Sequence, residues 1–188
     1  MKVHRIIPVS RVNGPGARFT LWVQGCSRGC PGCFNPLTHG DGGTDMTAEA
    51  IIRKIPAGDV TGITVSGGEP FEQPGELALL LEAAGKKGLH RLVYTGFTYE
   101  ELTAMENEAI TGALKFTDIL IDGPYREDIP PASPWTGSGN QRILELENGA
   151  IRSVLSDTAE SPGDGEIIIT ETGAVIATGI FNSAEITQ

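Results

Sequence analysis

The sequence lacks several features that mark common classes of protein. No apolar run approaches the ~20 residues that a membrane-spanning helix needs, so we expect no membrane segment. Basic residues are outnumbered, 14 Lys and Arg against 24 Asp and Glu. The resulting net charge of −10 argues against a nucleic-acid partner, which requires clustered positive charge. The first residues, Met1–Arg5, carry no apolar signal core, and we therefore expect a soluble, cytoplasmic protein.

Cysteine is also scarce, and its placement is the strongest signal in the chain. All three cysteines, Cys26, Cys30 and Cys33, follow a C-x3-C-x2-C pattern in a segment rich in glycine and proline. Without a secretion signal, such clustering favours a reducing compartment over a disulfide framework. Cysteine thiolates are the usual ligands of 4Fe–4S clusters. Because three thiolates leave one of four irons without a protein ligand, the pattern predicts a cluster that is open to a non-protein ligand.

The residues alone leave two other interpretations open. Together with His39, the cysteines make the ligand set of a Cys3His structural zinc site. They are also compatible with ordinary thiols. Chance is a poor explanation, however, since the cysteines are confined to residues 26–33 and the rest of the chain has none.

Patterns typical of strands and helices alternate along most of the chain. We expect strands at 3–9, 19–23, 60–66, 91–96 and 118–123, and helices at 46–55, 74–87 and 99–115. Thr47 and Thr98 are the predicted N-caps, and Glu101 would complete a capping box with Thr98. The alternation predicts an α/β fold with a parallel sheet, in which residues 3–9 form an edge strand.

The C-terminal part of the chain has a different character. Residues 124–142 are irregular and rich in proline, and residues 142–146 are predicted to be extended. A polar, mobile loop is expected at 156–165, followed by a β-hairpin over residues 166–177 that turns at 171–173. We expect one domain over 1–188, with a core at about 11–142 and an extension at 143–188.

Glycine and polar residues follow several of the expected strands. These strand ends carry the cysteine segment, Gly67-Gly68-Glu69, Thr95-Gly96 and Asp122-Gly123. In parallel α/β folds the active site lies at this edge of the sheet. The two glycines would let a ligand approach the backbone, and Glu69 would offset an ammonium charge. The alternative is structural: glycine turns at the strand ends, with Glu69 as an acid near a helix N-terminus.

The stretch from Asn13-Gly14-Pro15-Gly16 to Phe34-Asn35-Pro36 resembles the opening of the glycyl-radical-enzyme activating proteins, which are small radical S-adenosylmethionine (SAM) enzymes. Their pattern is D-G-P-G-x-R, an apolar strand, G-C-x3-C-x2-C, and an aromatic followed by Asn-Pro. This chain has Asn13 where Asp is usual, and Gly32 where many radical SAM enzymes have an aromatic. Gly32 followed by Phe34 is most similar to the branch that activates anaerobic ribonucleotide reductase.

The resemblance implies roles for particular residues. Cys26, Cys30 and Cys33 would ligate one 4Fe–4S cluster, and Gly67, Gly68 and Glu69 would hold the SAM amine. Phe34 would pack on adenine in place of the missing aromatic. Thr95, at the end of an expected strand, is a candidate for contacting the ribose or the methionine carboxylate. The segment from Trp135 to Arg142 is similar to the W-x-G-S-x-N-Q-R segment of the same branch and supplies Ser138, Asn140 and Arg142 as candidates at the mouth of the site. Asp122 is a further candidate for holding substrate or SAM.

The resemblance also implies an activity. Such an enzyme cleaves SAM reductively to a 5′-deoxyadenosyl radical, which abstracts hydrogen from a glycine of a large, anaerobic reductase-type glycyl radical enzyme. A flavodoxin- or ferredoxin-type reductant would supply the electron. Because 188 residues are too few for a full eight-stranded barrel of ~250 residues, we expect a partial, open radical-SAM-type β/α barrel with a C-terminal β-hairpin.

Two other functions remain open on the sequence. One is a radical SAM enzyme that acts on a peptide or a small molecule, and the other is a non-catalytic zinc or iron–sulfur binding module. The module would leave the glycine-rich strand ends without a role.

Overall fold

The computed structural model describes residues 1–155, 165–169, 173 and 175–179. Most of the predicted polar loop (156–164) and part of the predicted hairpin turn (171–172) lie outside the described residues. The main sheet is made of β1 (Lys2–Ser10), β2 (Arg18–Val23), β3 (Thr44–Asp45), β4 (Gly62–Gly67), β5 (His90–Tyr94), β6 (Ile119–Asp122), β7 (Arg142–Glu147) and β8 (Ala150–Leu155). Its strand order is β3-β1-β2-β4-β5-β6-β7-β8.

The centre of the sheet is parallel and its flanks are antiparallel. Strands β2, β4, β5 and β6 run parallel, as the alternating pattern predicts. Strand β1 pairs antiparallel with β2, and β7 pairs antiparallel with β6 and β8. The expected first strand is confirmed, but the short β3 pairs with its residues Lys2 and Val3, so β1 is an edge strand only beyond that point.

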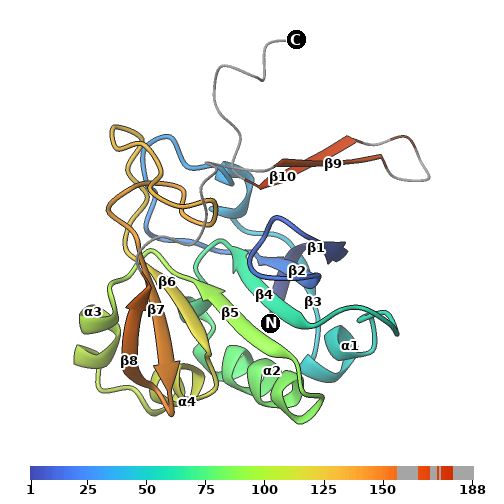
Figure 1. Cartoon of the computed structure of the whole chain (residues 1–188), viewed down its shortest axis with the longest axis horizontal. Helices are drawn as coiled ribbons and strands as arrows, with labels where there is room; N and C mark the ends of the chain where they lie inside the picture. The colour runs from blue at the N-terminus through green and yellow to red at the C-terminus, as the bar shows by residue number, and fades with distance from the viewer. Residues whose placement is uncertain (156–164, 170–172, 174, 180–188) are drawn as a thin grey trace.

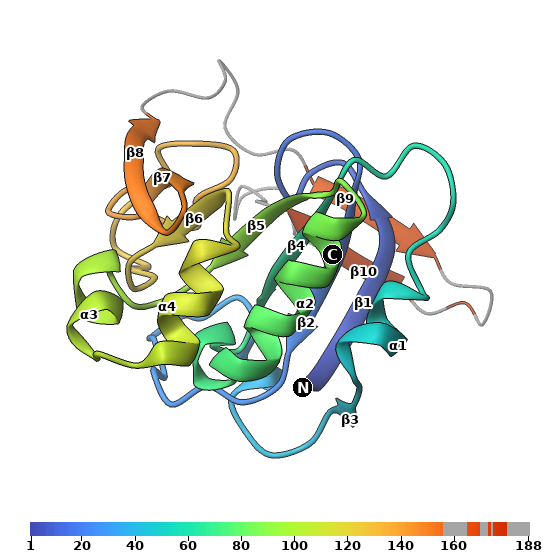
Figure 2. The ribbon, with the colours of Figure 1, turned by 90° about the horizontal axis from the view of Figure 1, so that it is seen from below.

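One face of the sheet is covered by helices. They are α1 (Ala48–Ile52), α2 (Pro74–Lys86), α3 (Tyr99–Ala104) and α4 (Glu108–Lys115), and Figure 2 shows α1, α2 and α4 in front of the strands. Thr47 caps α1 and Thr98 caps α3 with the predicted capping box. The main apolar core lies between these helices and the inward residues of the strands, such as Leu21, Val65 and Val93.

The prediction of one helix over 99–115 is wrong, because the segment forms α3 and α4 with a break between them. Glu106 has a positive φ of 48°, which a helix cannot continue through. The Asn107 side chain then accepts hydrogen bonds from the backbone N–H groups of Ala109 and Ile110 and starts α4. The break lets α4 pack beside α2 under the sheet (Figure 2).

The opposite face of the sheet lies under loops and a hairpin. The segment 124–141 and the hairpin of β9 (Gly165–Ile169) and β10 (Val175–Gly179) lie above the sheet in Figure 1. A second, smaller apolar cluster includes Leu92 and Ile121 of the strands, and Tyr94 and Trp135 pack against it. The strands therefore separate two environments, with helices on one side and long irregular segments on the other.

The C-terminal elements match the sequence in part. The predicted hairpin is confirmed as β9 paired antiparallel with β10. Strand β7 confirms the extended segment at 142–146, but β8 was not predicted. Asn148 and Gly149 join β7 to β8 with φ values of 51° and 84°, the positive values that a two-residue type I′ turn requires.

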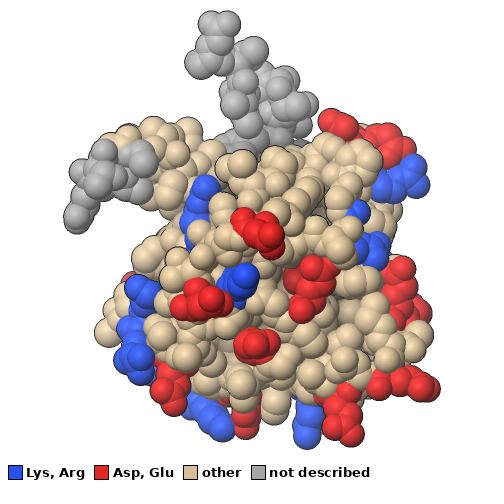
Figure 3. All heavy atoms as spheres, turned by 180° about the vertical axis from the view of Figure 1, so that it is seen from behind, with Lys and Arg blue, Asp and Glu red and all other residues tan. Residues whose placement is uncertain are grey.

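Two surface properties bear on the expected partners. Within the described residues, none of the helices is both long and apolar enough to cross a membrane. On the face seen in Figure 3, acidic and basic side chains are interspersed rather than gathered by sign. A cluster of positive charge for a phosphate backbone is therefore not visible on that face.

Candidate functional site

A cavity of about 460 Å³ opens where the parallel strands end. Its wall includes the three cysteines, the Gly67–Glu69 and Thr95–Gly96 strand ends, Tyr125, Gly137 and Gln141 of the irregular segment, and Ala177–Gly179 of the hairpin. The structure thus brings the predicted cysteine segment and two of the predicted strand ends to one place. At the third predicted strand end, Gly123 lines the cavity but Asp122 does not.

The cysteine segment folds as a closed loop after β2. The buried side chain of Gln24 donates hydrogen bonds to the carbonyls of Leu37 and Gly40, and the Gly25 N–H donates to the Thr38 carbonyl at 2.8 Å. The two ends of the loop are therefore tied together. Between them Cys26, Cys30 and Cys33 are half-buried free thiols that face the cavity.

Backbone N–H groups lie beside two of the three cysteine sulfurs. Burial raises the pKa of the Cys26 thiol, and backbone N–H groups of Arg28 and Gly29 act in the opposite direction. Cys33 accepts a backbone hydrogen bond from Asn35 at 3.4 Å, so its sulfur is also polarised by the loop. Backbone donors of this kind stabilise the charge on a cluster's sulfur ligands. The donor set therefore fits an iron–sulfur cluster.

A single-ion zinc site does not find the same support. In the described part of the chain, no three His, Cys, Asp or Glu side chains are grouped closely enough to hold one metal ion. His39 lines the cavity without joining the cysteines in such a group. In a cluster each cysteine binds a different iron, so its ligands need not converge on one point.

Gly67 and Gly68 hold the cysteine loop against the end of β4. The Gly68 N–H donates to the Val23 carbonyl, and the Glu69 N–H donates to the Gly25 carbonyl at 2.8 Å. A Cβ atom on Gly68 would lie only 2.0 Å from the Gly25 carbonyl oxygen. A side chain at Gly67 would meet the backbone of Val23 and strain a φ of 111°. Both glycines are therefore required for the loop to reach the cavity.

Glu69 is a buried carboxylate without a cationic partner among the described residues. It is 1% exposed and accepts hydrogen bonds from Phe71 N, Gly96 N and Thr95 Oγ1. Burial raises its pKa to about 7, against the three hydrogen bonds, which favour the charged form. Since it also lines the cavity, Glu69 is suited to receive a cation from a ligand.

Thr95 supports Glu69. Its hydroxyl donates to Glu69 Oε1 at 2.9 Å and accepts from the Phe97 N–H at 3.1 Å. The one hydroxyl proton is therefore already used inside the protein. A direct contact between Thr95 and a ligand stays a prediction, and the structure gives this residue a definite task in orienting the acid.

Phe34 forms one side of the cavity together with a residue that the sequence did not point to. Its ring is 57% exposed and stacks at a tilt on Tyr125, with 4.7 Å between ring centres. Gly137 makes room for this pair, since a Cβ there would lie 3.0 Å from Phe34 and 3.1 Å from Tyr125. Gly32, which stands where many radical SAM enzymes have an aromatic, has a φ of 67°, a value that favours glycine.

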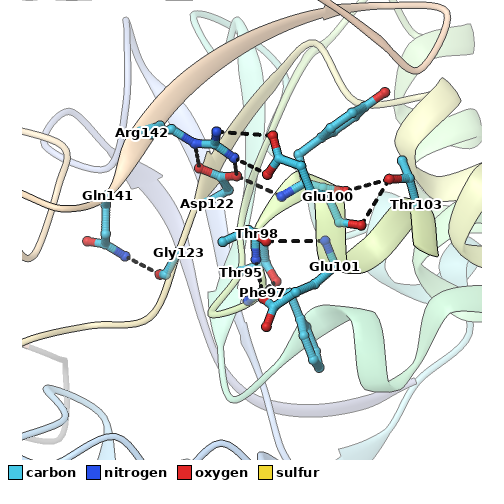
Figure 4. Close-up of polar contacts among 11 residues, drawn as sticks. Thr95, Phe97, Thr98, Glu100, Glu101, Thr103, Asp122, Gly123, Gln141 and Arg142 are labelled. Carbon is cyan, nitrogen blue, oxygen red and sulfur yellow. Dashed lines mark hydrogen bonds and ion pairs between the residues drawn. The ribbon is translucent and has the colours of Figure 1, made fainter. Parts of the chain in front are cut away.

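The remaining candidates lie beside the cavity, outside its wall. Asp122 is fully buried and accepts hydrogen bonds from Tyr99 N and from Arg142, which also pairs with Glu100 (Figure 4). These contacts tie the end of β6 to the start of α3. Ser138 is buried and accepts from Arg126 N. Each of these side chains thus has a structural partner within the fold.

Asn140 also lies outside the cavity wall, but one of its side-chain atoms has no partner among the described residues. Its amide nitrogen donates to the Pro124 carbonyl at 2.7 Å, and its amide oxygen is buried without a partner among the described residues. It does not line the cavity. The prediction that Asn140 contacts the cofactor remains a prediction.

Asn13, which stands where the family pattern has Asp, contacts the C-terminal hairpin. The Asn13 amide nitrogen donates to Ser10 Oγ at 2.8 Å and to Thr178 Oγ1 at 2.9 Å. Ser10 in turn donates to Glu166 of β9 at 2.7 Å. An Asp at position 13 would lose these donors and add a second negative charge near Glu166. Asn13 therefore attaches the hairpin to the rim of the cavity.

Sequence reasoning missed further residues of the cavity wall, among them Trp22, Arg28, Tyr125 and Gln141. Two of them, Arg28 and Gln141, lie inside sequence motifs that could have pointed to the site. Arg28 lies inside the cysteine pattern, and Gln141 lies inside the W-x-G-S-x-N-Q-R segment. Gln141 donates to the Gly123 carbonyl and accepts from Gly137 N, which fixes the irregular segment over the strand end. Tyr125 gave no signal, because its role depends on a contact with Phe34.

Comparisons with known proteins agree with this site. A family model described as a 4Fe-4S single cluster domain matches residues 12–144. Over 157 residues the chain is 31% identical to the anaerobic ribonucleoside-triphosphate reductase-activating protein of Enterobacteria phage T4, covering 79% of this chain and 97% of the relative. The proteins of the same name from Salmonella typhi and Escherichia coli (strain K12) are 34% and 33% identical, covering 78% of this chain and 99% of each relative. The chain therefore belongs to the family of anaerobic ribonucleoside-triphosphate reductase-activating proteins, the branch that its cysteine segment resembles.

Proposed function

We propose that the chain is a radical SAM enzyme that activates an anaerobic ribonucleoside-triphosphate reductase. Cys26, Cys30 and Cys33 would hold one 4Fe–4S cluster, SAM would occupy the adjoining cavity, and hydrogen would be abstracted from a glycine of the reductase. The observation that supports this most is the meeting of three free cysteines and Glu69 in one cavity at the strand ends, since Glu69 is a buried carboxylate that has no cationic partner among the described residues.

When bound, the cluster and SAM would supply a one-electron cleavage of a carbon–sulfur bond of SAM. The protein's own task is to bind, orient and exclude water. Gly67 and Gly68 allow the cysteine loop and a ligand to approach the end of β4, and Glu69 faces the ligand's ammonium. Trp22 and the Phe34–Tyr125 pair supply apolar wall. This chemistry requires no nucleophile or general base.

We also infer that the fold is an open form of the radical SAM β/α barrel and that residues 1–188 act as one domain. Four parallel strands carry the cavity at their C-terminal ends, and antiparallel strands flank them on both sides. An incomplete barrel leaves one side accessible to a glycine-bearing loop of a large partner. A flavodoxin- or ferredoxin-type protein would deliver the electron to the cluster.

Anaerobic reconstitution tests the proposal. We expect four irons per chain, 5′-deoxyadenosine formed from SAM when dithionite is added, and an electron paramagnetic resonance signal of a glycyl radical when the reductase is present. Cys26→Ala, Cys30→Ala and Cys33→Ala should each abolish all three, whereas Ser27→Ala should keep them. Bound zinc without SAM turnover would overturn the proposal. SAM cleavage without a glycyl radical would favour a peptide or small-molecule substrate.

A further inference from the structure

Arg28 lies between the first two cysteines and lines the cavity. Its guanidinium carbon stands 4.5 Å from the centre of the Phe97 ring. A Cβ on Gly96 would lie 3.3 Å from Arg28 Nε, so the glycine leaves room for the guanidinium beside this strand-end loop. Stacking on an aromatic face fixes a guanidinium without using its N–H donors. Arg28 is therefore held in place with its donors available.

Other arginines near the cavity have hydrogen-bond or ion-pair partners, whereas Arg28 has none of these kinds among the described residues. Arg18 is fully buried and donates to Thr64 Oγ1 and to the Ile63 carbonyl. Arg142 pairs with the carboxylates of Asp122 and Glu100. In the described part of the chain, the guanidinium of Arg28 makes neither a hydrogen bond nor an ion pair. Its five donors remain free for a ligand in the cavity.

Glu69 also lies beside Gly96. The Gly96 N–H donates to Glu69 Oε2 at 2.8 Å, and a Cβ on Gly96 would lie 3.6 Å from that oxygen. The acid and Arg28 do not form an ion pair with each other. Around Gly96 the cavity wall thus presents a carboxylate and a guanidinium, neither of which has an ion-pair partner among the described residues. An α-amino acid carries an ammonium and a carboxylate on one carbon, the complement of this arrangement.

We propose that Arg28 binds the α-carboxylate of the methionine part of SAM, with Glu69 facing the ammonium. This assignment rests on the proposed function, which places SAM in the cavity. Thr95 is less suited to the carboxylate because its hydroxyl proton is donated to Glu69. A carboxylate has two oxygens, so one can accept from Arg28 while the other stays free for the cluster.

The test compares SAM with S-adenosyl-3-methylthiopropylamine, which lacks only the carboxylate. Binding of both is measured by equilibrium dialysis with the anaerobically reconstituted protein, without reductant. Arg28→Gln should weaken SAM binding by about ten- to a hundredfold, the loss of a charge-assisted pair. It should leave the affinity of the analogue within about twofold of wild type. Arg28→Lys should restore part of the lost affinity, because it keeps the charge without the planar fork.

The outcomes separate this assignment from the proposed function. If wild type binds and cleaves SAM but Arg28→Gln binds SAM equally well, only the assignment of Arg28 fails. An equal loss for SAM and for the analogue also overturns it. If wild type does not bind SAM, both proposals fail. Iron content is measured in each variant, and loss of iron in both Arg28→Gln and Arg28→Lys would assign Arg28 to folding of the loop instead. Arg126→Gln, an exposed arginine outside this cavity, is the matched control.

Discussion

The two faces of the central sheet are built from alternate residues of the same strands, yet they do different work. Toward the helices β2 places Phe19, Leu21 and Val23, all fully buried in the main core. On the other face, which we call the cavity face, the same strand places buried Thr20 and the ring of Trp22, which lines the cavity. This face therefore combines buried polar side chains such as Thr20 with the smaller apolar cluster around Ile121. We expect most of the stability to come from the helix-covered face and ligand binding to depend on the cavity face.

The largest effect should come from the helix-covered face. Leu80 of α2 is fully buried in the main core, so Leu80→Ala should lower the free energy of unfolding by about 2–5 kcal/mol through lost burial and a cavity. The neighbouring Leu79 is 60% exposed, and Leu79→Ala should change stability by less than about 0.5 kcal/mol. Urea denaturation of the apoprotein measures both. Equal losses for the two variants would contradict the packing of α2 on the sheet through Leu80.

The second prediction concerns the cost of the unpaired acid on the cavity face. Burial raises the pKa of Glu69 to about 7, so the folded state keeps its proton at pH values where the unfolded state has lost it. The protonated Glu69 therefore contributes to the free energy of unfolding at pH values below the pKa of Glu69 in the unfolded chain. This contribution is lost as the pH rises to about 7. The loss should be on the order of 3 kcal/mol, by 1.36 kcal/mol per pKa unit.

Glu69→Gln should remove that dependence. The difference in unfolding free energy between wild type and Glu69→Gln, measured in urea at pH 5 and at pH 8, should shift in favour of the variant at the higher pH. Glu106→Gln, an exposed position, serves as the control and should show no such shift. If the two variants follow the same pH profile, Glu69 is not a strained buried acid. Binding of the SAM ammonium would lower the pKa of Glu69, so SAM affinity should fall as the pH drops below about 7.

The third prediction addresses how the cysteine loop is held to the cavity. In Gly68→Ala the new methyl would meet the Gly25 carbonyl and push the loop away from β4, at an expected cost of about 1–3 kcal/mol. Iron retained after anaerobic reconstitution should fall together with stability. Gly75→Ala, where a Cβ meets no atom within 4 Å, should keep both. Full iron content in Gly68→Ala would show that the loop does not depend on this close approach.

The sequence predicted the parts of the molecule that depend on local pattern. Short apolar and β-branched runs, separated by helix patterns, located the parallel strands, and the cysteine spacing located the candidate site. The break between α3 and α4 was missed because neither Met105 nor Glu106 is a strong helix breaker, and only the capping by Asn107 reveals it. The β7–β8 hairpin was missed although Asn148-Gly149 is a strong turn signal.

Contacts between residues far apart in the sequence could not be predicted from local pattern. The task of Thr95 depends on Glu69, which lies 26 positions earlier in the chain. The contact between Phe34 and Tyr125 joins two loops that come together only when the irregular segment folds over the sheet. The link from Asn13 to Thr178 spans 165 positions. Side-chain partners of this kind are set by the tertiary fold, so residue type and spacing alone cannot specify them.

The smallest effect is expected where two threonines lie side by side on the cavity face. Thr20 and Thr64 are paired in register on β2 and β4. Thr64 Oγ1 accepts from Arg18 Nε and donates to the Asn13 carbonyl, whereas the hydroxyl of Thr20 is buried without a partner among the described residues. Thr20→Val therefore removes an unpaired polar group and should stabilise the apoprotein by up to about 1 kcal/mol.

Thr64→Val is the matched variant and should behave in the opposite way. It leaves a donor of the buried Arg18 without an acceptor, and burial already lowers the pKa of this arginine to about 10. A loss of about 1–3 kcal/mol in unfolding free energy is expected, measured in urea beside Thr20→Val. Destabilisation of the two variants by the same amount would mean that the Thr20 hydroxyl has a partner in solution. The two threonines would then not differ in how far their hydroxyls are satisfied, and the expected contrast between them would be wrong.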